Sequence, residues 1–346
     1  MIYFNNDYSE GCHSRVLSKL TATNMEQTPG YGEDAYCREA ADHIRRICEN
    51  DTLSVHFLVG GTQTNMTVIA AALRPHQGVI SAQTGHIHVH ETGAVEATGH
   101  KVLSLPSNDG KLTAQLIKAC VESHYSDASA EHIVQPKMVY ISNPTELGTI
   151  YSKAELAAIS EVCREHQLYL FLDGARLGYG LTAKGNDLTM ADIARLCDVF
   201  YIGGTKVGAL FGEAVVFSNT ALSQDFRYLI KQRGGMLAKG RLLGVQFSAL
   251  LEDGLYFDIS KKANALADKI RATLDSLGYP YLVPGVTNQI FPILPDVLLD
   301  KLKEEFSFSE QERVDTNHRA IRFCTSWATT EENVDALCDA LRDYSK

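Results

Sequence analysis

The chain has 346 residues, of which 45% are hydrophobic and 21% are charged, and its formal net charge is −10. This composition is typical of a globular protein with room for one large domain and a smaller one, and it excludes a disordered chain. Nucleic-acid binding needs clustered Lys and Arg, whereas the basic residues here are scattered, which argues against a nucleic-acid partner.

The eight cysteines are isolated and form no Cys-x-x-Cys pair, which favours free buried thiols in a reducing compartment. The first residues, MIYFNNDYSEG, lack the basic stretch and apolar core of a signal peptide. No apolar run approaches the length of a membrane span. We therefore expect a cytoplasmic protein with no membrane partner.

Helix and strand patterns alternate over the first 250 residues. Residues 33–49 form an amphipathic pattern typical of a helix, and residues 53–59 predict a strand that leads into a helical stretch ending near residue 73. Further strands are predicted at residues 79–80, 102–105, 138–141, 168–172, 199–202 and 214–217, with helices at 153–166 and 189–196. This alternation predicts an α/β fold with a mostly parallel sheet between two layers of helices.

The pattern changes after about residue 251. We predict one helix over residues 260–277, a strand over 321–324, and a capping box, Thr329-x-x-Glu332, at the start of a last helix. These elements indicate two domains. Residues 1–250 comprise an N-terminal arm and a large domain, and residues 251–346 form a small C-terminal α+β domain.

The segment LYLFLDGARLG places Asp173 and Arg176 directly after an apolar run that is typical of a strand buried on both faces. Folds of this class bind their ligands beyond the carboxyl ends of the parallel strands. The two charged residues therefore mark a candidate ligand site.

The segment VGGTQTN places Gly61 and Thr62 between a predicted strand and a predicted helix. Backbone amides at a helix N-terminus, with a hydroxyl beside them, can hold a phosphate group. A tight turn in which Thr62 caps the helix is an equally good interpretation of this segment taken alone.

The segment GGTKVGALFG places Lys206 in a glycine-rich loop after another predicted strand. A buried lysine has a lowered pKa and can form an imine with an aldehyde, although a surface lysine is the simpler interpretation. In GHIHVHETGA, the alternate histidines His86, His88 and His90 would share one face of a strand and could bind a metal, but a stacking role for His86 is favoured over a metal site.

Together these segments supply the groups that pyridoxal 5′-phosphate (PLP) needs. That cofactor requires a phosphate site, a lysine for its imine and a carboxylate that keeps its pyridine nitrogen protonated. We therefore predict PLP as the cofactor, with Asp173 as the carboxylate and Lys206 as the imine lysine, and we predict no metal.

The order and spacing of the motifs resemble those of the threonine aldolases, fold-type I PLP enzymes of the β-eliminating-lyase group. The resemblance extends over nearly the whole chain and rests on Asn6-Asp7-Tyr8-Ser9, Gly30-Tyr31-Gly32, GGTQTN, GHIHVHETGA, SNPTELGTIYS, LDGARLG, GGTK, QRGGMLAKGR and IRFCTSW. It implies a PLP-dependent transferase-like fold. It also implies reversible cleavage of β-hydroxy-α-amino acids, L-threonine or L-allo-threonine, to glycine and acetaldehyde.

The resemblance further implies roles for single residues at the cofactor. Gly61 and Thr62 would hold the phosphate, and His86 would stack on the ring. Asp173 would pair with the ring nitrogen, and Lys206 would form the imine.

Other residues are implied to contact the substrate. Arg176 would face the phenolic oxygen of the ring or the substrate carboxylate, and Arg322 would clamp that carboxylate through its planar guanidinium. Asn6 and Ser9 lie in the N-terminal segment that would reach the same carboxylate. His132 matches a histidine near the substrate hydroxyl.

Two further positions imply a homo-oligomer, either a dimer or a dimer of dimers, that is, a homotetramer. Tyr31 and Arg233 resemble residues that approach the cofactor from a neighbouring subunit.

His86 and His132 are the two candidate bases, and the sequence does not decide between them.

Two other functions stay open. Another fold-type I reaction on a small amino acid, such as β-elimination or transamination, would use the same cofactor residues. A nucleotide-binding α/β protein without catalytic activity would explain the phosphate site, but it would leave Lys206 and Asp173 without a role.

Overall fold

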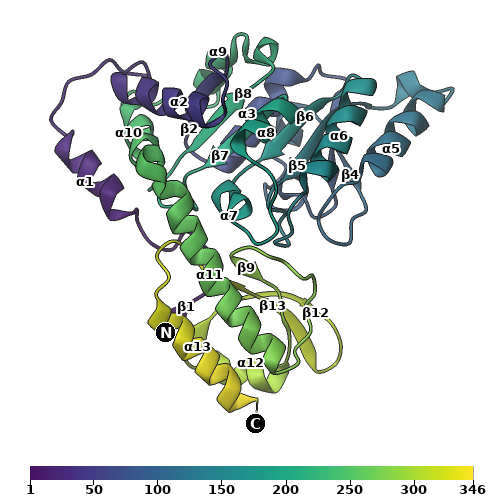
Figure 1. Ribbon diagram of the computed structural model, residues 1–346. Helices are drawn as coiled ribbons and strands as arrows, with labels where there is room; N and C mark the ends of the chain where they lie inside the picture. Colours follow the sequence, from purple (N-terminus) through teal and green to yellow (C-terminus); the bar gives the residue numbers. More distant parts are fainter. Residues whose placement is uncertain (346) are drawn as a thin grey trace.

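The computed structural model describes residues 1–345, and its centre is a seven-stranded sheet (Figure 1). The strands lie in the order β2 (Ser54–Leu58), β8 (Glu213–Phe217), β7 (Val199–Gly203), β6 (Tyr169–Asp173), β5 (Gln135–Ser142), β3 (Gln77–Ala82) and β4 (Val102–Leu105). Neighbouring strands from β7 to β4 are parallel, and β8 runs antiparallel to both β7 and β2. This arrangement confirms the predicted α/β fold with a mostly parallel sheet.

The sheet is buried on both faces because its central strands are mostly apolar and their residues are mostly buried. In β6, Leu170 and Leu172 belong to one hydrophobic core, while Phe171 between them belongs to the core on the opposite face. Alternate side chains of a strand point to opposite faces, so a continuous apolar run supplies both cores at once.

Helices cover the two faces. The helices of this part of the chain are α1 (Ser14–Ala22), α2 (Ala35–Ile47), α3 (Gly61–Ala72), α4 (His86–Val89), α5 (Ala114–Ser126), α6 (Lys153–Glu165), α7 (Leu177–Leu181), α8 (Met190–Leu196), α9 (Phe226–Gln232) and α10 (Arg241–Leu251). α3 and α9 contribute Val68, Ile69 and Phe226 to the core on one face, and α5 and α6 contribute to the other. The ends of α6 agree with the prediction because Ser152 and Glu155 form a capping box at its start.

A second hydrophobic core lies in the C-terminal part of the chain. It is built by α11 (Leu255–Ser276), α12 (Asp296–Leu302) and α13 (Glu331–Tyr344), which pack on the strands β9 (Gln289–Ile290), β10 (Ile293–Pro295), β12 (Ser309–Arg313) and β13 (His318–Cys324). Figure 1 shows α11 running from the large sheet to this lower core. The two cores meet within α11, since Ala263 packs in the first and Leu266 in the second. The domain boundary near residue 250 stays a prediction.

The N-terminus belongs to this second core and not to the first. β1 (Ile2–Tyr3) pairs in parallel with β11 (Phe306–Ser307), and Phe4 is fully buried among the C-terminal side chains. The capping box predicted at Thr329 is wrong, because the N-cap of the last helix is the next residue, Thr330. Thr330 caps α13 by accepting from the Asn333 amide, whereas the hydroxyl of Thr329 accepts a hydrogen bond from the Ser326 amide.

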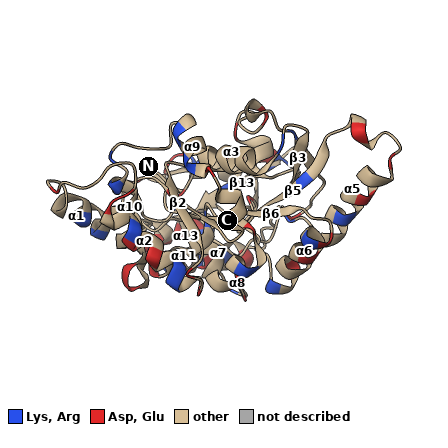
Figure 2. Ribbon diagram, turned by 90° about the horizontal axis from the view of Figure 1, so that it is seen from above, with Lys and Arg blue, Asp and Glu red and all other residues tan. Residues whose placement is uncertain are grey.

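Acidic and basic residues mix on the outer helices. Figure 2 shows both colours along the ribbon of α6. No helix within residues 1–345 is long and apolar enough to cross a membrane.

Candidate active site

Two adjoining cavities open at the carboxyl ends of the parallel strands. The first, of about 340 Å³, is lined by six of the residues singled out in the sequence: Gly61, Thr62, His86, Asp173, Arg176 and Lys206. The second shares His86, Arg176 and Lys206 with the first and adds Arg322. The fold therefore gathers residues from five separate segments at the edge of the sheet where such folds bind ligands.

Asp173 is the last residue of β6 and is buried at the floor of the first cavity. Its Oδ2 accepts hydrogen bonds from the Tyr140 hydroxyl at 2.5 Å and the Asn65 amide at 3.1 Å, and its Oδ1 accepts from the Ala175 backbone amide at 2.9 Å. A carboxylate fixed by three donors keeps one orientation, which suits a partner that must be held in place. The sequence interpretation did not include Tyr140 or Asn65, because neither stands in a motif with Asp173.

Lys206 follows β7 in the glycine-rich loop, and its side chain reaches the same cavity. The Tyr179 hydroxyl donates to its backbone carbonyl at 2.7 Å and fixes the loop. Burial lowers the pKa of the Lys206 amine, and the positive charge of Arg176 lowers it further. A lysine with a lowered pKa has a larger neutral fraction, and the neutral amine is the nucleophilic form.

The first turn of α3 faces this cavity. Its N-cap residue is Gly60, and no side chain caps the amides that follow. Thr62 lies inside the helix, so it does not cap the helix as one of the two sequence interpretations assumed. Uncapped amides at the start of a twelve-residue helix, with the Thr62 hydroxyl beside them, suit an anionic group.

His86 begins the short helix α4, and hydrogen bonds connect its ring to Glu91 and, through Asn65, to Asp173. Its Nδ1 lies 2.7 Å from Glu91 Oε1, which also accepts from the Asn65 amide at 2.7 Å. Asn65 donates to Asp173 as well, so one chain of hydrogen bonds joins His86 to Asp173. Residues 86–89 are helical, so the three alternate histidines do not share a face as they would in a strand.

Arg176 is engaged by a carboxylate that the sequence interpretation did not assign. Its Nε and Nη2 donate to the two oxygens of Asp7 at 2.7 and 2.9 Å, and Asn288 donates to Asp7 at 2.9 Å. Burial alone would raise the pKa of Asp7, but the charges of Arg176 and Lys206 lower it overall. Asp7 stands inside the quoted N-terminal motif, but nothing local distinguishes it from its neighbours.

Arg322 projects from β13 into the second cavity. Its Nη1 donates to Gln289 at 3.2 Å and its Nη2 to the Asn5 carbonyl at 2.8 Å, while its Nε is buried without a partner within the described residues. Arg319, three residues earlier, instead pairs with Glu310 and Asp296. Only Arg322 of these two arginines faces the cavity.

The approach of Asn6 and Ser9 to the substrate carboxylate stays a prediction. The Asn6 side chain accepts hydrogen bonds from the Tyr8 amide at 3.0 Å and the Ser9 hydroxyl at 3.1 Å, so the two predicted side chains are bonded to each other. The N-terminal segment does reach the site, but through Asp7, Tyr8 and the Asn5 carbonyl.

The structure does not bring His132 into this cavity of the chain, and its role as a base stays a prediction. His132 is exposed in a short 3-10 turn just before β5 begins, whereas the cavity lies where β5 ends, at Ser142. A strand of eight residues spans roughly 26 Å. The spacing between His132 and Asn143 is therefore the length of the strand, and it places them at opposite edges of the sheet.

Tyr31 and Arg233 lie outside the two cavities of this chain. Tyr31 is half exposed with a positive φ of 61°, and the Lys231 amine lies 5.0 Å from the centre of its ring. The Arg233 carbonyl accepts a hydrogen bond from the Gln63 side chain in the first turn of α3, which brings this segment close to that turn. Their approach to a neighbouring subunit stays a prediction.

A further buried carboxyl at the first cavity was missed. Glu213, at the start of β8, accepts from the Thr205 hydroxyl at 2.8 Å and the Gly204 amide at 3.2 Å, and burial raises its pKa to about 8. In the sequence, Glu213 follows the glycine-rich loop of Lys206 and cannot be told from the first residue of an ordinary strand. No local pattern marks it.

Comparisons with known proteins were made for the whole chain. Residues 9–295 match the model of the β-eliminating lyase family. The chain belongs to this family. It is 31% identical to the low specificity L-threonine aldolase of Pseudomonas sp. (strain NCIMB 10558), over 98% of this chain and 96% of that protein. It is 29% identical, over the same shares, to the low specificity L-threonine aldolase of Pseudomonas aeruginosa.

Solved structures agree with the family. The Leishmania major threonine aldolase superposes with a TM-score of 0.98 at 46% identity, with 100% of each chain covered. An aspartate aminotransferase of Thermus thermophilus, at 15% identity, superposes with a TM-score of 0.73 over 99% of this chain and 91% of that one. At that identity the second likeness shows the fold alone. The β-eliminating lyase described here thus has the fold-type I architecture.

Proposed function

We propose that this protein is a PLP-dependent threonine aldolase. It cleaves L-threonine and L-allo-threonine reversibly to glycine and acetaldehyde. The observation that carries the proposal is that Lys206 and Asp173 line one cavity together with the uncapped first turn of α3, in a chain that is 46% identical to a threonine aldolase over its whole length.

The donor groups of the cavity fit PLP on chemical grounds. Lys206 has a lowered pKa and supplies the amine for the imine. Asp173 supplies a fixed carboxylate for the pyridine nitrogen, and the first turn of α3, with Gly61 and Thr62, supplies amides and a hydroxyl for the phosphate. When bound, PLP accepts the electron pair that the breaking Cα–Cβ bond leaves on Cα.

The side chains around the second cavity would bind and orient the amino acid. Arg322 offers its guanidinium to the substrate carboxylate, because its present partners are a neutral amide and a carbonyl. The fork of Arg176 is already engaged by Asp7, so Arg176 contributes its charge and not a free bidentate contact. With Nδ1 held by Glu91, His86 directs its other ring nitrogen, Nε2, away from that carboxylate.

The protein is proposed to act as a homo-oligomer, in which the segments around Tyr31 and Arg233 approach the cofactor site of a neighbouring subunit. The support is their position next to α3, through Gln63, together with the exposed aromatic surface of Tyr31 and Tyr228. The mass of the assembly in solution tests this proposal.

Three measurements on purified protein loaded with PLP test the function. An imine absorption band that borohydride bleaches would exclude the nucleotide-binding alternative. Acetaldehyde and glycine formed from L-threonine would establish aldol cleavage, whereas 2-oxobutanoate and ammonia would establish β-elimination. Rates measured side by side for L-threonine and L-allo-threonine would define the preference at Cβ.

A further inference from the structure

Glu146 is a carboxyl that neither the motifs nor the proposed function assigns, and it lines both cavities. It lies in the segment between β5 and α6, opposite His86 and close to Asp173. Each cavity includes Lys206 and Arg176, so Glu146 faces the space between the cofactor residues and the substrate residues.

Within the described residues, hydrogen bonds from other residues reach only one of the two carboxyl oxygens of Glu146. Its Oε1 accepts hydrogen bonds from the His86 backbone amide at 2.9 Å and from the Ser142 hydroxyl at 2.7 Å. Among residues 1–345, no other residue donates a hydrogen bond to its Oε2, while the backbone amide of Glu146 itself contacts the carboxyl. Neighbouring residues thus anchor the carboxyl through Oε1, and the side chain lines both cavities.

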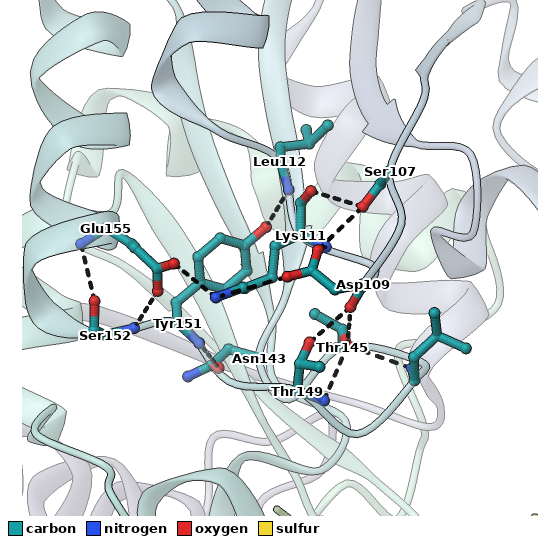
Figure 3. A network of polar contacts seen from close by, with 11 residues as sticks. Ser107, Asp109, Lys111, Leu112, Asn143, Thr145, Thr149, Tyr151, Ser152 and Glu155 are labelled. Atoms are coloured by element: carbon teal, nitrogen blue, oxygen red, sulfur yellow. Dashed lines mark hydrogen bonds and ion pairs between the residues drawn. The ribbon is translucent and has the colours of Figure 1, made fainter. Parts of the chain in front are cut away.

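The chain on either side of Glu146 is fixed by a network of polar contacts, shown in Figure 3. The Thr145 amide donates to the Thr149 carbonyl at 2.9 Å, and the Thr149 hydroxyl donates to the Asp109 carbonyl at 2.8 Å. The Tyr151 amide donates to Asn143 at 3.1 Å. A side chain carried by a segment that is anchored on both sides keeps its position, as proton transfer requires.

The charges around Glu146 favour a carboxyl that exchanges a proton. Burial raises its pKa, the negative charge of Asp173 raises it further, and the hydrogen bonds from Ser142 and His86 partly oppose this. The other titratable groups that line the two cavities are Tyr8, His86, His90, Asp173, Arg176, Tyr201, Lys206, Glu213 and Arg322. The ionisation of Tyr140 and Tyr151 is also affected by its charge.

We propose that Glu146 is a catalytic residue whose Oε2 accepts the proton of the β-hydroxyl group during cleavage. The inference rests on the proposed aldolase function and replaces His132, which lies at the far edge of the sheet. The O–H bond breaks as its proton moves to Oε2, a carbonyl forms at Cβ, and the electron pair of the Cα–Cβ bond passes to Cα. Cα then takes a proton to give glycine and Glu146 loses its own, so no proton is consumed overall.

Glu146→Gln tests this assignment in the PLP-loaded enzyme, because Gln keeps an oxygen for Ser142 and His86 but cannot take up the proton. We expect cleavage of L-threonine to fall at least about 100-fold. Exchange of the glycine α-proton in D₂O, followed by NMR, should remain near the wild-type rate because glycine has no β-hydroxyl. The exposed Glu96→Gln is the matched control and should leave both rates unchanged.

Ser142→Ala gives an independent measurement that does not depend on how Glu146→Gln folds. Removing a donor that favours the carboxylate raises the pKa of Glu146, so the acidic limb of the kcat/KM profile should move up by about one pH unit. An unmoved limb would overturn the assignment.

The other outcomes are distinct. Full cleavage by Glu146→Gln would overturn the inference alone and leave His86 as the base. An equal loss of cleavage and glycine exchange, with the imine band intact, would also overturn it and assign Glu146 to holding His86 in place. A wild-type protein that cleaves no β-hydroxy amino acid would overturn the proposed function itself, and the inference with it.

Discussion

Lys206 is buried, and it lines the same cavity as Arg176. Both the burial and the positive charge favour the neutral amine. Lys206→Ala should therefore lose the imine band and nearly all cleavage. Borohydride reduction followed by peptide mapping should place the label on Lys206, whereas a label on the exposed Lys184 or Lys239 would contradict the assignment.

Hydrogen bonds fix the Asp173 carboxylate at the cavity, which distinguishes Asp173 from an aspartate that only shapes a turn. Asp173→Asn keeps an oxygen for the Ala175 amide but removes the charge that keeps a pyridine nitrogen protonated. Each pKa unit lost by that nitrogen corresponds to about 1.4 kcal/mol. We expect a variant that still binds PLP and is coloured, but that cleaves threonine orders of magnitude more slowly.

Cofactor occupancy and cleavage are to be measured on one preparation of Asp173→Asn. Full occupancy with wild-type cleavage would mean that Asp173 only shapes the turn after β6.

The N-terminal segment and the end of β6 are joined by the buried pair of Asp7 and Arg176. Asp7→Asn leaves the Arg176 charge buried without a partner, and such a change costs about 3 kcal/mol or more of unfolding free energy at neutral pH. The exposed Asp51→Asn is the control and should cost less than about 0.5 kcal/mol. Chemical denaturation followed by circular dichroism measures both.

The same pair predicts how stability depends on pH. The pKa of Asp7 is lower in the folded chain than its ordinary value of 3.8, so its contribution is present above that value and is lost as the pH falls through the folded pKa. Acidification below about pH 4 should therefore narrow the difference in stability between wild type and Asp7→Asn. A difference that stays constant down to pH 2 would show that Asp7 does not titrate in this range.

The sequence predicts the elements of the large sheet well because its strands are continuous apolar runs. The run before Asp173 and the residues 102–105 agree closely with β6 and β4. Gly61, Asp173 and Lys206 could be found for a related reason, since each follows a strand in a recognisable motif. His132 could not be placed, because a spacing in the sequence does not record at which end of a strand a residue lies.

Asp7, Glu146 and Glu213 escaped the sequence interpretation because their roles depend on the assembled fold. Each is an ordinary polar residue in its own segment. Asp7 and Glu146 each have a partner from a segment that is distant in the sequence, Arg176 and the His86 amide, respectively. Whether a carboxyl is buried at a cavity depends on the residues that surround it in the folded chain, and the local sequence does not record this.

At the scale of the whole molecule, the site combines the two hydrophobic cores. The sheet of the first core carries the residues proposed to bind the cofactor, while β13 of the second carries Arg322 to the cavity. Arg322→Ala should lower kcat/KM roughly 30-fold, because a charged contact to the substrate carboxylate is removed. This factor corresponds to a loss of about 2 kcal/mol of transition-state stabilisation. The imine spectrum should stay intact, because Arg322 does not line the first cavity.

Arg319→Ala is the matched control on the same strand. It removes surface ion pairs to Asp296 and Glu310, which contribute little to stability because solvent screens them, and it should leave kcat/KM unchanged. A larger effect from Arg319 than from Arg322 would reverse the assignment.

The pairing of β1 with β11 has a consequence for how the protein is made. The Asn5 carbonyl accepts a hydrogen bond from a guanidinium 317 positions later in the sequence, so residue 5 is synthesised long before its partner Arg322. Contacts of such long sequence separation form late, after the local ones, and domains begin to fold during synthesis. A chain that ends before β11 contains the strands of the large sheet and Lys206, but it lacks β13 and therefore Arg322. The two cavities can thus acquire all their lining residues only after residue 322 has been synthesised.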